Sequence, residues 1–533
     1  MMNSESTKLS ISSKWLPDFA VVVSGLLVTV SLLLIASRKR KGKLSARLPP
    51  GPQGWPVLGC LPYMGELPHQ SLAEMAKKYG PLMFVRLGSE GFVIASSPKV
   101  AEEFLKQNDK VWTSRRDHAA GNILFYGGQD IFQAPYGDRW RYAKKIFVQE
   151  LFTVKRLSDF RGIRKQEIML GINDAIERCC SGTKAVRMDL LVAKLSTNNV
   201  TRMMMNDGEG TLSDEASAMK ASDQFQQAIK DFTALLGALY LGDFIPWLDR
   251  IDPQGMKKRL RAVHKKLDTF LQKIVDDHKL TIEAARSRGQ AIPDDIVYSL
   301  LTRTRDADGQ HLSETEIKAI LVDIIVGGTD DISVTIEWAL SELLKDSCIL
   351  EKAQAEMDSV VGRERLVNES DLPNLPYLNA IVMETFRLHP AGVLIPRSSV
   401  EDCEIQGYKI PAKTSLMINV HAINRDPEVY DRASDFLPER FLNSKMDLDG
   451  KDFSLLTFGT GRRICPGKGL GFLFVQYSLA LFIQTCNWSL PPGLKPEDLD
   501  MEEKFSVTIC RRTPLQLVLV PRLPINLLQQ YRE

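Results

Sequence analysis

One cysteine of the chain lies in a glycine-rich loop directly before an apolar helical stretch. Residues 458–467 read FGTGRRICPG, and the apolar stretch runs from Leu470 to Thr485. The N-terminus of a helix offers free N–H groups and the positive end of the helix dipole, so we expect the pKa of the Cys465 thiol to be lowered. Two glycines of the loop permit a tight turn whose backbone donors point at the sulfur. An enclosed, electron-rich sulfur of this kind suits an iron ion.

This loop matches the pattern F-x-x-G-x-R-x-C-x-G of the cytochrome P-450 superfamily at every fixed position. Two other segments resemble family motifs in the family's order, namely residues 384–387 (ETFR, like E-x-x-R) and residues 438–441 (PERF). The resemblance implies an ion network of Glu384, Arg387 and Arg440 that holds the core on the haem side together. It extends from the proline-rich segment to about Arg522. The segments that look like those of plant microsomal members, closest to enzymes that act on flavonoids and phenylpropanoids, are 49–52, 54–56, 134–137 and 242–246.

The resemblance implies that the chain binds haem b, with Cys465 as the iron ligand and Phe458 as a further cofactor-binding residue. Family members hold the haem propionates mainly with cations. The residues that match these positions are Trp140, Lys144, Arg397 and Arg463. Lys144 stands where the W-x-x-x-R motif of the family usually has arginine. Lysine keeps the charge, but it lacks the planar fork that bonds a carboxylate through two N–H groups.

The central helix departs from the family where a threonine is usual. The family has A/G-G-x-D/E-T-T/S, whereas residues 327–332 read GGTDDI, so Asp331 replaces the threonine. By resemblance, the catalytic residues of this helix are Gly328, Asp330 and Asp331. An aspartate can pass on a proton if burial raises its pKa, and a bound water or Ser333 is the alternative. Because successive helical side chains point in different directions, we do not expect the two aspartates to share a proton.

Two reaction classes remain open for this site. The first, which we favour, is hydroxylation of a lipophilic or aromatic small molecule, a reaction that in this family takes O₂ and two electrons. The second is haem chemistry without dioxygen activation, such as dehydration or isomerisation, which does not need the missing threonine. A haem protein that only binds or senses a ligand is a third class, and a buried thiolate suits it poorly.

Electrons for hydroxylation must come from another protein. The chain has no G-x-G-x-x-G segment at a strand–helix junction and no second cofactor domain. The resemblance implies that the electron donor is an NADPH-dependent cytochrome P-450 reductase in the same membrane. Basic residues near the haem motifs form either a docking face for this acidic partner or an ordinary solvated surface. They are Arg139, Arg141, Lys145, Arg462 and Lys468.

By resemblance, the substrate contacts come from separate segments of the chain. These are residues 122–125, Ile324 and Val326, residues 393–395, and residues 507–509. Nearly all of them are apolar, which suits a lipophilic or aromatic substrate. Any of them could equally belong to the core.

The segments that must position these residues are mostly helical. The longest predicted helix begins at a capping box of Ser313 and Glu316 and continues without proline to about Leu344, a length of roughly 50 Å. Its first half is apolar on nearly every side, which places it in the core. Gly327 and Gly328 in its middle each cost about 1 kcal/mol relative to alanine. We therefore expect another group to approach the backbone closely there, in the simplest case through plain packing.

Strands are few in the predicted fold. Residues 82–87 and 92–95 are two apolar runs around a glycine-bounded turn, which predicts a hairpin. A second sheet-like stretch covers residues 403–420. The predicted fold class is therefore mainly α with a small β part. By resemblance it is the cytochrome P-450 fold, with its long central helix over the haem.

The first fifty residues predict a membrane anchor. Residues 19–36 carry no charge and have about the length of one bilayer-spanning helix. Five basic residues follow between positions 38 and 43, so the positive-inside rule places the rest of the chain in the cytosol. A cleaved signal peptide is the competing interpretation. We predict a lumenal N-terminus (1–18), a transmembrane anchor (19–36), a basic and proline-rich hinge (37–52) and a haem-thiolate catalytic domain (53–533) on the cytoplasmic side of the endoplasmic reticulum membrane, in contact with its lipid.

Composition agrees with a large globular protein. The chain has 533 residues, of which 44% are hydrophobic, so it can bury a sizeable core. Its 68 basic and 66 acidic residues leave a net charge of +2, which gives no support for nucleic-acid binding. The eight cysteines show no paired metal-ligand spacing such as C-x-x-C, and we interpret their thiols as reduced.

Overall fold

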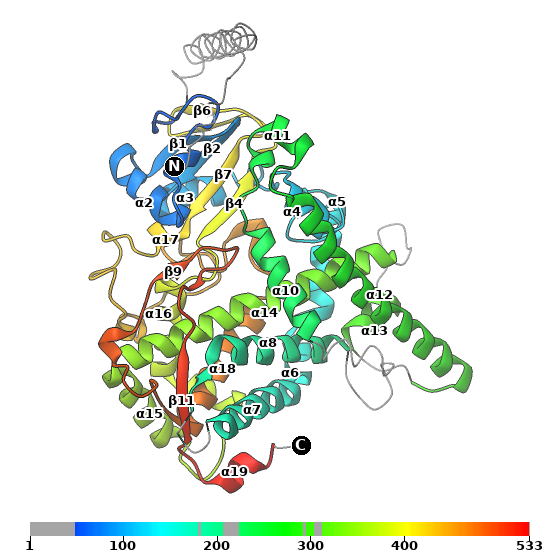
Figure 1. Ribbon diagram of the computed structural model, residues 1–533, viewed down its shortest axis with the longest axis vertical. Coiled ribbons are helices and arrows are strands. Elements are labelled where there is room, and N and C mark those ends of the chain that lie inside the picture. Colours follow the sequence, from blue (N-terminus) through cyan, green and yellow to red (C-terminus); the bar gives the residue numbers. More distant parts are fainter. Residues whose placement is uncertain are drawn as a thin grey trace, which may run out of the picture.

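The computed structural model describes residues 48–179, 182, 184–205, 223–291, 295–302 and 312–531. A small sheet lies at one end of the molecule, and most helices gather beside it around the long helix α14 (Figure 1). The predicted N-terminus (1–18), the anchor (19–36) and most of the hinge (37–52) lie outside the described residues. Within the described ranges, no helix combines the length and the apolar character that crossing a bilayer requires.

Helices make up most of the described chain, which confirms the predicted class. The α-helices are α2 (Pro68–Tyr79), α3 (Pro98–Glu102), α4 (Ala119–Leu124), α5 (Asp138–Ile146), α6 (Val154–Asp159), α7 (Arg161–Arg178), α8 (Met188–Met205), α10 (Asp223–Leu236), α11 (Pro246–Ile251), α12 (Met256–Arg288), α13 (Ile296–Thr302), α14 (Glu314–Lys345), α15 (Ser347–Val360), α16 (Pro376–Leu388), α17 (Val420–Ile423), α18 (Lys468–Thr485) and α19 (Ile525–Gln529). The other short helical segments are η1 (Leu61–Tyr63), η2 (Glu103–Gln107), η3 (Phe147–Leu151), η4 (Leu241–Asp243), η5 (Glu369–Asn374), η6 (Pro438–Phe441), η7 (Gly461–Arg463) and η8 (Pro496–Asp498).

The strands form one four-stranded sheet and three smaller ones. The larger sheet has the order β1-β2-β7-β4, in which β2 and β7 are parallel and the outer pairs antiparallel. Its strands are β1 (Leu82–Leu87), β2 (Glu90–Ala95), β4 (Leu394–Ser398) and β7 (Ser415–Asn419). The smaller sheets pair β5 (Cys403–Ile405) with β6 (Tyr408–Ile410), β9 (Glu503–Lys504) with β10 (Cys510–Arg511), and β11 (Gln516–Pro521) with β3 (Val186–Arg187) and β8 (Cys486–Ser489).

Both predicted β regions are confirmed. The hairpin of β1 and β2 pairs Leu82 with Ala95 and Leu87 with Glu90, so the second strand begins two residues earlier than expected. The stretch 403–420 divides between the β5–β6 hairpin and β7 of the larger sheet. The end of the proline-rich segment packs on β1, because the Phe84 N–H donates to the carbonyl oxygen of Pro50 at 2.8 Å.

Helix α14 crosses the core as predicted. It begins at the Ser313–Glu316 capping box and has 32 residues, or about 48 Å at the usual rise per residue. Helix α8 packs against its middle, where a Cβ built on Gly328 would lie 2.7 Å from Cγ2 of the buried Val200. A Cβ on Gly327 would meet no atom within 4 Å. The expected close approach is therefore confirmed for Gly328, and its cause is packing between two helices.

The two neighbouring glycines give a matched test of this packing. We expect Gly328→Ala to lower the free energy of unfolding by roughly 1–3 kcal/mol, because the new methyl group overpacks against Val200. Gly327→Ala should be neutral or slightly stabilising, since alanine has the higher helix propensity. Adding Val200→Ala should recover part of the loss in the Gly328 variant. Thermal unfolding of the purified proteins measures all three, and equal melting temperatures for the two single glycine variants would contradict the expectation.

Candidate active site around Cys465

The path of the Cys465 loop is fixed by a backbone hydrogen bond and by the close approach of Asp109 to Gly461. The Cys465 N–H donates to the carbonyl oxygen of Phe458 at 2.9 Å, which closes the loop just before α18 begins. Gly461 has φ +68°, and a Cβ there would lie 2.8 Å from Oδ1 of Asp109. Only glycine fits both the left-handed conformation and the close approach. The glycines of the motif therefore fix the path of the backbone that presents the sulfur.

The pKa of the Cys465 thiol is raised to about 11, whereas the sequence predicts a lowered value. Burial is the largest cause, and the Asp331 carboxylate adds to it. The Gly467 N–H and Lys144 act in the other direction but do not outweigh them. The prediction was wrong because the sulfur lies among many protein atoms, although its side chain is partly exposed, and this desolvation exceeds the help of a helix N-terminus. Coordination to a metal ion removes the proton in any case, so the site still suits an iron ligand.

A cluster of cations lies beside the loop, of which Arg397 and Arg463 are buried and Arg115 and Lys144 are half-buried. Arg397 is only 2% exposed, and burial together with repulsion from Arg115 and Arg463 holds its pKa well below the usual value. Burial lowers the pKa of Arg115 to about 10 and that of Arg463 to about 9, and Lys144 is shifted in the same direction. Buried like charges are costly unless an anionic group faces them. The two propionates of haem provide such a group, so these residues fit the cofactor.

The hydrogen bonds of the cluster show how each cation is held. Arg463 donates through Nε and both terminal nitrogens to the carbonyl oxygens of Thr113, Ile131 and Ala134, which uses three of its five N–H groups. Arg397 donates to the carbonyl oxygen of Pro396 at 2.9 Å. Lys144 donates to the carbonyl oxygen of Arg462.

Trp140 contacts two cations of the cluster, while its own N–H is bonded to the backbone. Its Nε1–H donates to the carbonyl oxygen of Ile131 at 3.0 Å. The guanidinium carbon of Arg463 lies 4.5 Å from the centre of the indole and the Lys144 ammonium 5.2 Å, both within range of a cation–π interaction. Trp140 thus lies in the predicted site, but as a platform for Arg463 and Lys144.

Sequence reasoning missed Arg115. The Arg115 side chain donates from Nε to the carbonyl oxygen of Phe132 at 2.9 Å and from a terminal nitrogen to the carbonyl oxygen of Pro396. Because Pro396 directly precedes Arg397, these bonds place Arg115 beside the cluster. In the sequence it is one of two adjacent arginines outside any motif. No pattern distinguishes it there from Arg116, and only the fold places it against the other cations.

Asp331 lies near the Cys465 sulfur, and its pKa is raised well above that of an ordinary aspartate. Burial and the neighbouring Asp330 raise its pKa to about 7. The Asp331 carboxylate also raises the pKa of the Cys465 thiol, so the two groups lie near each other. Asp330 is turned to another partner, because its Oδ2 accepts a hydrogen bond of 2.6 Å from the Thr508 hydroxyl. Ser333 is buried and donates to the carbonyl oxygen of Asp330, so its hydroxyl is engaged in the helix.

The predicted substrate segments meet on α14 in part. Leu124, Phe125 and Ile324 belong to one apolar cluster, in which Phe125 packs edge-on against Phe232 of α10 at 5.2 Å. The loop 507–509 joins the same region through Thr508 and Asp330, and the Ile509 N–H donates to the carbonyl oxygen of Ala391 just before residues 393–395. Asn122, by contrast, is exposed and bonds Asp117.

The predicted ion network is confirmed. Arg387 bonds both carboxylate oxygens of Glu384, at 2.6 and 2.7 Å, and Arg440 adds a third bond at 3.0 Å. The side chains of Glu384 and Arg387 are both 0% exposed. The network connects α16 to η6.

The predicted basic face is largely neutralised by neighbouring carboxylates. Four of its five cations form ion pairs, and Lys145 is the member without one in the part of the chain that the structure describes. The pairs are Arg139 with Glu316, Arg141 with Asp138, Arg462 with Asp109, and Lys468 with Asp449. The face therefore carries a weaker positive field than the sequence indicates.

Comparison with known proteins agrees with this site. A profile of the cytochrome P450 family matches residues 49–517. A flavonoid 3′-monooxygenase of Crocosmia x crocosmiiflora is 38% identical over 95% of this chain and 98% of its own length, and one of Arabidopsis thaliana is 40% identical over 94% and 97%. A solved zebra fish cytochrome P450 with progesterone superposes with a TM-score of 0.70 at 23% identity, over 85% of this chain and 99% of that chain. The chain belongs to the cytochrome P450 family and is a monooxygenase of that family.

Proposed function

We propose that this monooxygenase hydroxylates a flavonoid or a related phenylpropanoid, using O₂ and electrons from an NADPH-cytochrome P450 reductase. The observation that carries the proposal is the position and acidity of Asp331, which lies near Cys465 and whose pKa is raised to about 7 by burial and by Asp330. A group that is half protonated near neutral pH can both deliver a proton and recover one. Asp331 thereby takes over the task for which the family uses a hydroxyl group.

Bound haem supplies the redox chemistry that inserts one oxygen atom of O₂ into a C–H bond. The residues that would hold it are Cys465 at the iron and the cations Arg115, Arg397, Arg463 and Lys144 at the propionates. Phe458 closes the loop behind the sulfur by accepting the Cys465 N–H. Together these residues would hold the cofactor beside the loop.

Asp331 holds the proton at a carboxyl oxygen, and the residues around it keep that proton available. Asp330 is bonded to Thr508 and therefore does not form a shared-proton pair with Asp331. Its charge nevertheless helps to keep the Asp331 pKa high. Gly328 acts through packing, because it lets α8 press on α14 one turn before the carboxyl group.

An aromatic substrate fits the apolar lining. Phe125, Phe232 and Ile324 are buried in one apolar cluster around the first half of α14, where the Phe125 ring lies edge-on to Phe232, and walls of this kind suit a lipophilic or aromatic molecule. The similarity to flavonoid 3′-monooxygenases supports a flavonoid as the substrate class.

The N-terminal sequence supports a location of the enzyme at a membrane. An uncharged stretch at residues 19–36, followed by basic residues, supports a single-pass anchor in the endoplasmic reticulum membrane with the catalytic domain (53–533) on the cytoplasmic side. An anchored reductase in the same lipid bilayer would supply the electrons. Since the basic face is mostly paired, Lys145 is the cation most available to attract an acidic partner.

The acidity of Asp331 leads to a pH-dependent prediction. Its protonated fraction falls as the pH rises through about 7, so we expect the ratio of product to NADPH consumed to fall from about pH 6 to about pH 8. Asp331→Asn cannot deliver an acidic proton and should lower this ratio by roughly 10- to 100-fold, with no remaining pH dependence over that range. Asp331→Thr should retain activity but lose the same pH dependence. The measurement is NADPH- and O₂-dependent turnover of a flavonoid panel with reductase in microsomes.

The same assay separates the alternative reaction class. The alternative class, dehydration or isomerisation, would be favoured by one result. In that case the reduced, carbon monoxide-bound haem shows thiolate-type absorption, but neither NADPH nor O₂ is consumed. Loss of that absorption in folded, haem-loaded protein would refute the assignment of Cys465 itself.

Adjacent arginines provide a matched test of the propionate contacts. We expect Arg115→Met to weaken haem binding by about 10- to 100-fold, because a charge-assisted hydrogen bond contributes about 1.5–3 kcal/mol and each 1.4 kcal/mol is tenfold. Arg116→Met is the control, since Arg116 pairs with Glu90 and packs on Phe244 away from the cluster. Transfer of haem to excess apomyoglobin measures the loss. Equal transfer rates for the two variants would remove Arg115 from the cofactor site.

A further inference from the structure

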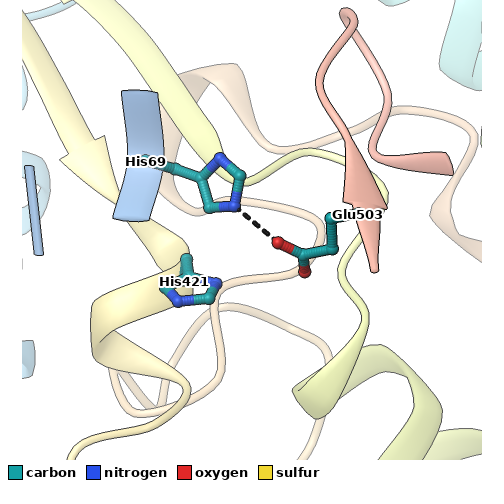
Figure 2. A group of neighbouring side chains, drawn as sticks. All are labelled: His69, His421 and Glu503. Carbon is teal, nitrogen blue, oxygen red and sulfur yellow. Dashed lines mark hydrogen bonds and ion pairs between the residues drawn. The ribbon is translucent and has the colours of Figure 1, made fainter. Parts of the chain in front are cut away.

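Three metal-ligating side chains meet far from Cys465 in the sequence and outside the site described above. His69 of α2, His421 of α17 and Glu503 of β9 each offer one ligand atom, and these three atoms lie within 4.8 Å of one another. Figure 2 shows the side chains converging from three separate elements, with His69 Nε2 and Glu503 Oε2 only 2.8 Å apart. In a tetrahedral zinc site, neighbouring ligand atoms are about 3.4 Å apart. Small side-chain rotations therefore suffice to enclose an ion.

Hydrogen bonding within the cluster is incomplete. Nδ1 of His69 and Nδ1 of His421 are both buried and find no hydrogen-bond partner among the described residues. His69 is itself 0% exposed. A buried ring nitrogen without a hydrogen-bond partner is costly, and coordination of a metal ion by His421 is one way to recover that cost.

The surrounding residues orient the ligands in advance. Asn419 donates to the carbonyl oxygen of His69 at 2.9 Å, and its Oδ1 caps the helix that carries His421. Gln70 donates to Oε2 of Glu503 at 2.7 Å, and Phe505 stacks on the His69 ring with 5.9 Å between the ring centres. Such outer contacts hold ligands in place and are typical of metal sites.

We propose that His69, His421 and Glu503 bind a divalent cation of the zinc class, with water as the fourth ligand. Two imidazoles and one carboxylate are a donor set that suits zinc. On binding, His69 Nε2 exchanges its hydrogen bond to Glu503 for the metal, and the ring proton is then carried by Nδ1. His421 is only partly buried, so the ion can enter on its side. Arg425 adds a like charge nearby, which makes the site weaker than a closed four-ligand site.

The ion would join three parts of the chain that are otherwise linked by packing and by the few hydrogen bonds described above. Helix α2 lies beside the four-stranded sheet, α17 follows its strand β7, and β9 leads to the loop 507–509 (Figure 1). Thr508 of that loop bonds Asp330, so zinc would also steady one wall of the active site. The role that follows is structural.

Zinc binding by the haem-loaded, full-length protein tests the proposal. Titration with zinc chloride against a chromogenic chelator should show one tightly bound ion per chain in the wild type. His421→Gln and Glu503→Gln should each weaken this binding by more than about 100-fold, since loss of an outer-shell partner alone costs roughly 10- to 100-fold. His264→Gln, a histidine of α12 outside the cluster, should bind zinc like the wild type. Carbon monoxide difference spectra confirm that each variant is folded and haem-loaded.

Zinc-edge X-ray absorption identifies the ligands. We expect nitrogen and oxygen ligands at about 2.0–2.2 Å, with two histidines and no sulfur. Equal zinc binding by the wild type and His421→Gln would overturn the proposal, and so would sulfur ligands, which would assign the ion to a cysteine. Because His421 is partly exposed, its glutamine variant is tolerated by the fold even if Glu503→Gln is not.

Discussion

The buried ion network on α16 is the constraint from which the geometry of the active site follows. Glu384 has no access to water, and it is compensated by Arg387 and Arg440. Arg387 donates its remaining hydrogen bonds to the carbonyl oxygens of Asn424, Ala433 and Asp435. These bonds hold the segment before η6 against α16. Removing one member of such a network costs about 3–5 kcal/mol, since the other charges stay buried. The arrangement is therefore all or none.

Further contacts connect helix α16 to the Cys465 loop. The carbonyl oxygen of Phe386, on the same helix, accepts a hydrogen bond of 2.7 Å from the Thr457 hydroxyl. The Phe386 ring also packs edge-on against Phe458 at 5.1 Å. Phe458 in turn accepts the N–H of Cys465. The position of the sulfur thus depends on charges that never contact it, which explains why widely separated sequence motifs serve one site.

The sequence predicted well those features that reside in local patterns or short motifs. The capping box and length of α14, the β1–β2 hairpin and the Glu384 network are of this kind. It failed where burial decides the outcome, because the helix N-terminus at Cys465 suggests a low pKa and desolvation raises it. It also could not find Arg115, or the group of His69, His421 and Glu503, whose members are brought together only by the fold. Such contacts leave no periodicity or spacing to detect.

Helix α14 links the two sides of the active site through its carboxyl groups. Burial and the nearby Asp130 raise the pKa of Asp323 well above the usual value, and its Oδ2 accepts the N–H of Ile131 at 2.6 Å. The carbonyl oxygen of Ile131 then receives bonds from both Trp140 and Arg463. Two turns further along the same helix, Asp331 lies near the sulfur. Because one helix carries Asp323 and Asp331, the segment around Ile131 and the carboxyl group near the sulfur keep a fixed distance from each other. An aspartate can therefore stand at the position of the usual threonine without any change in the frame that positions it.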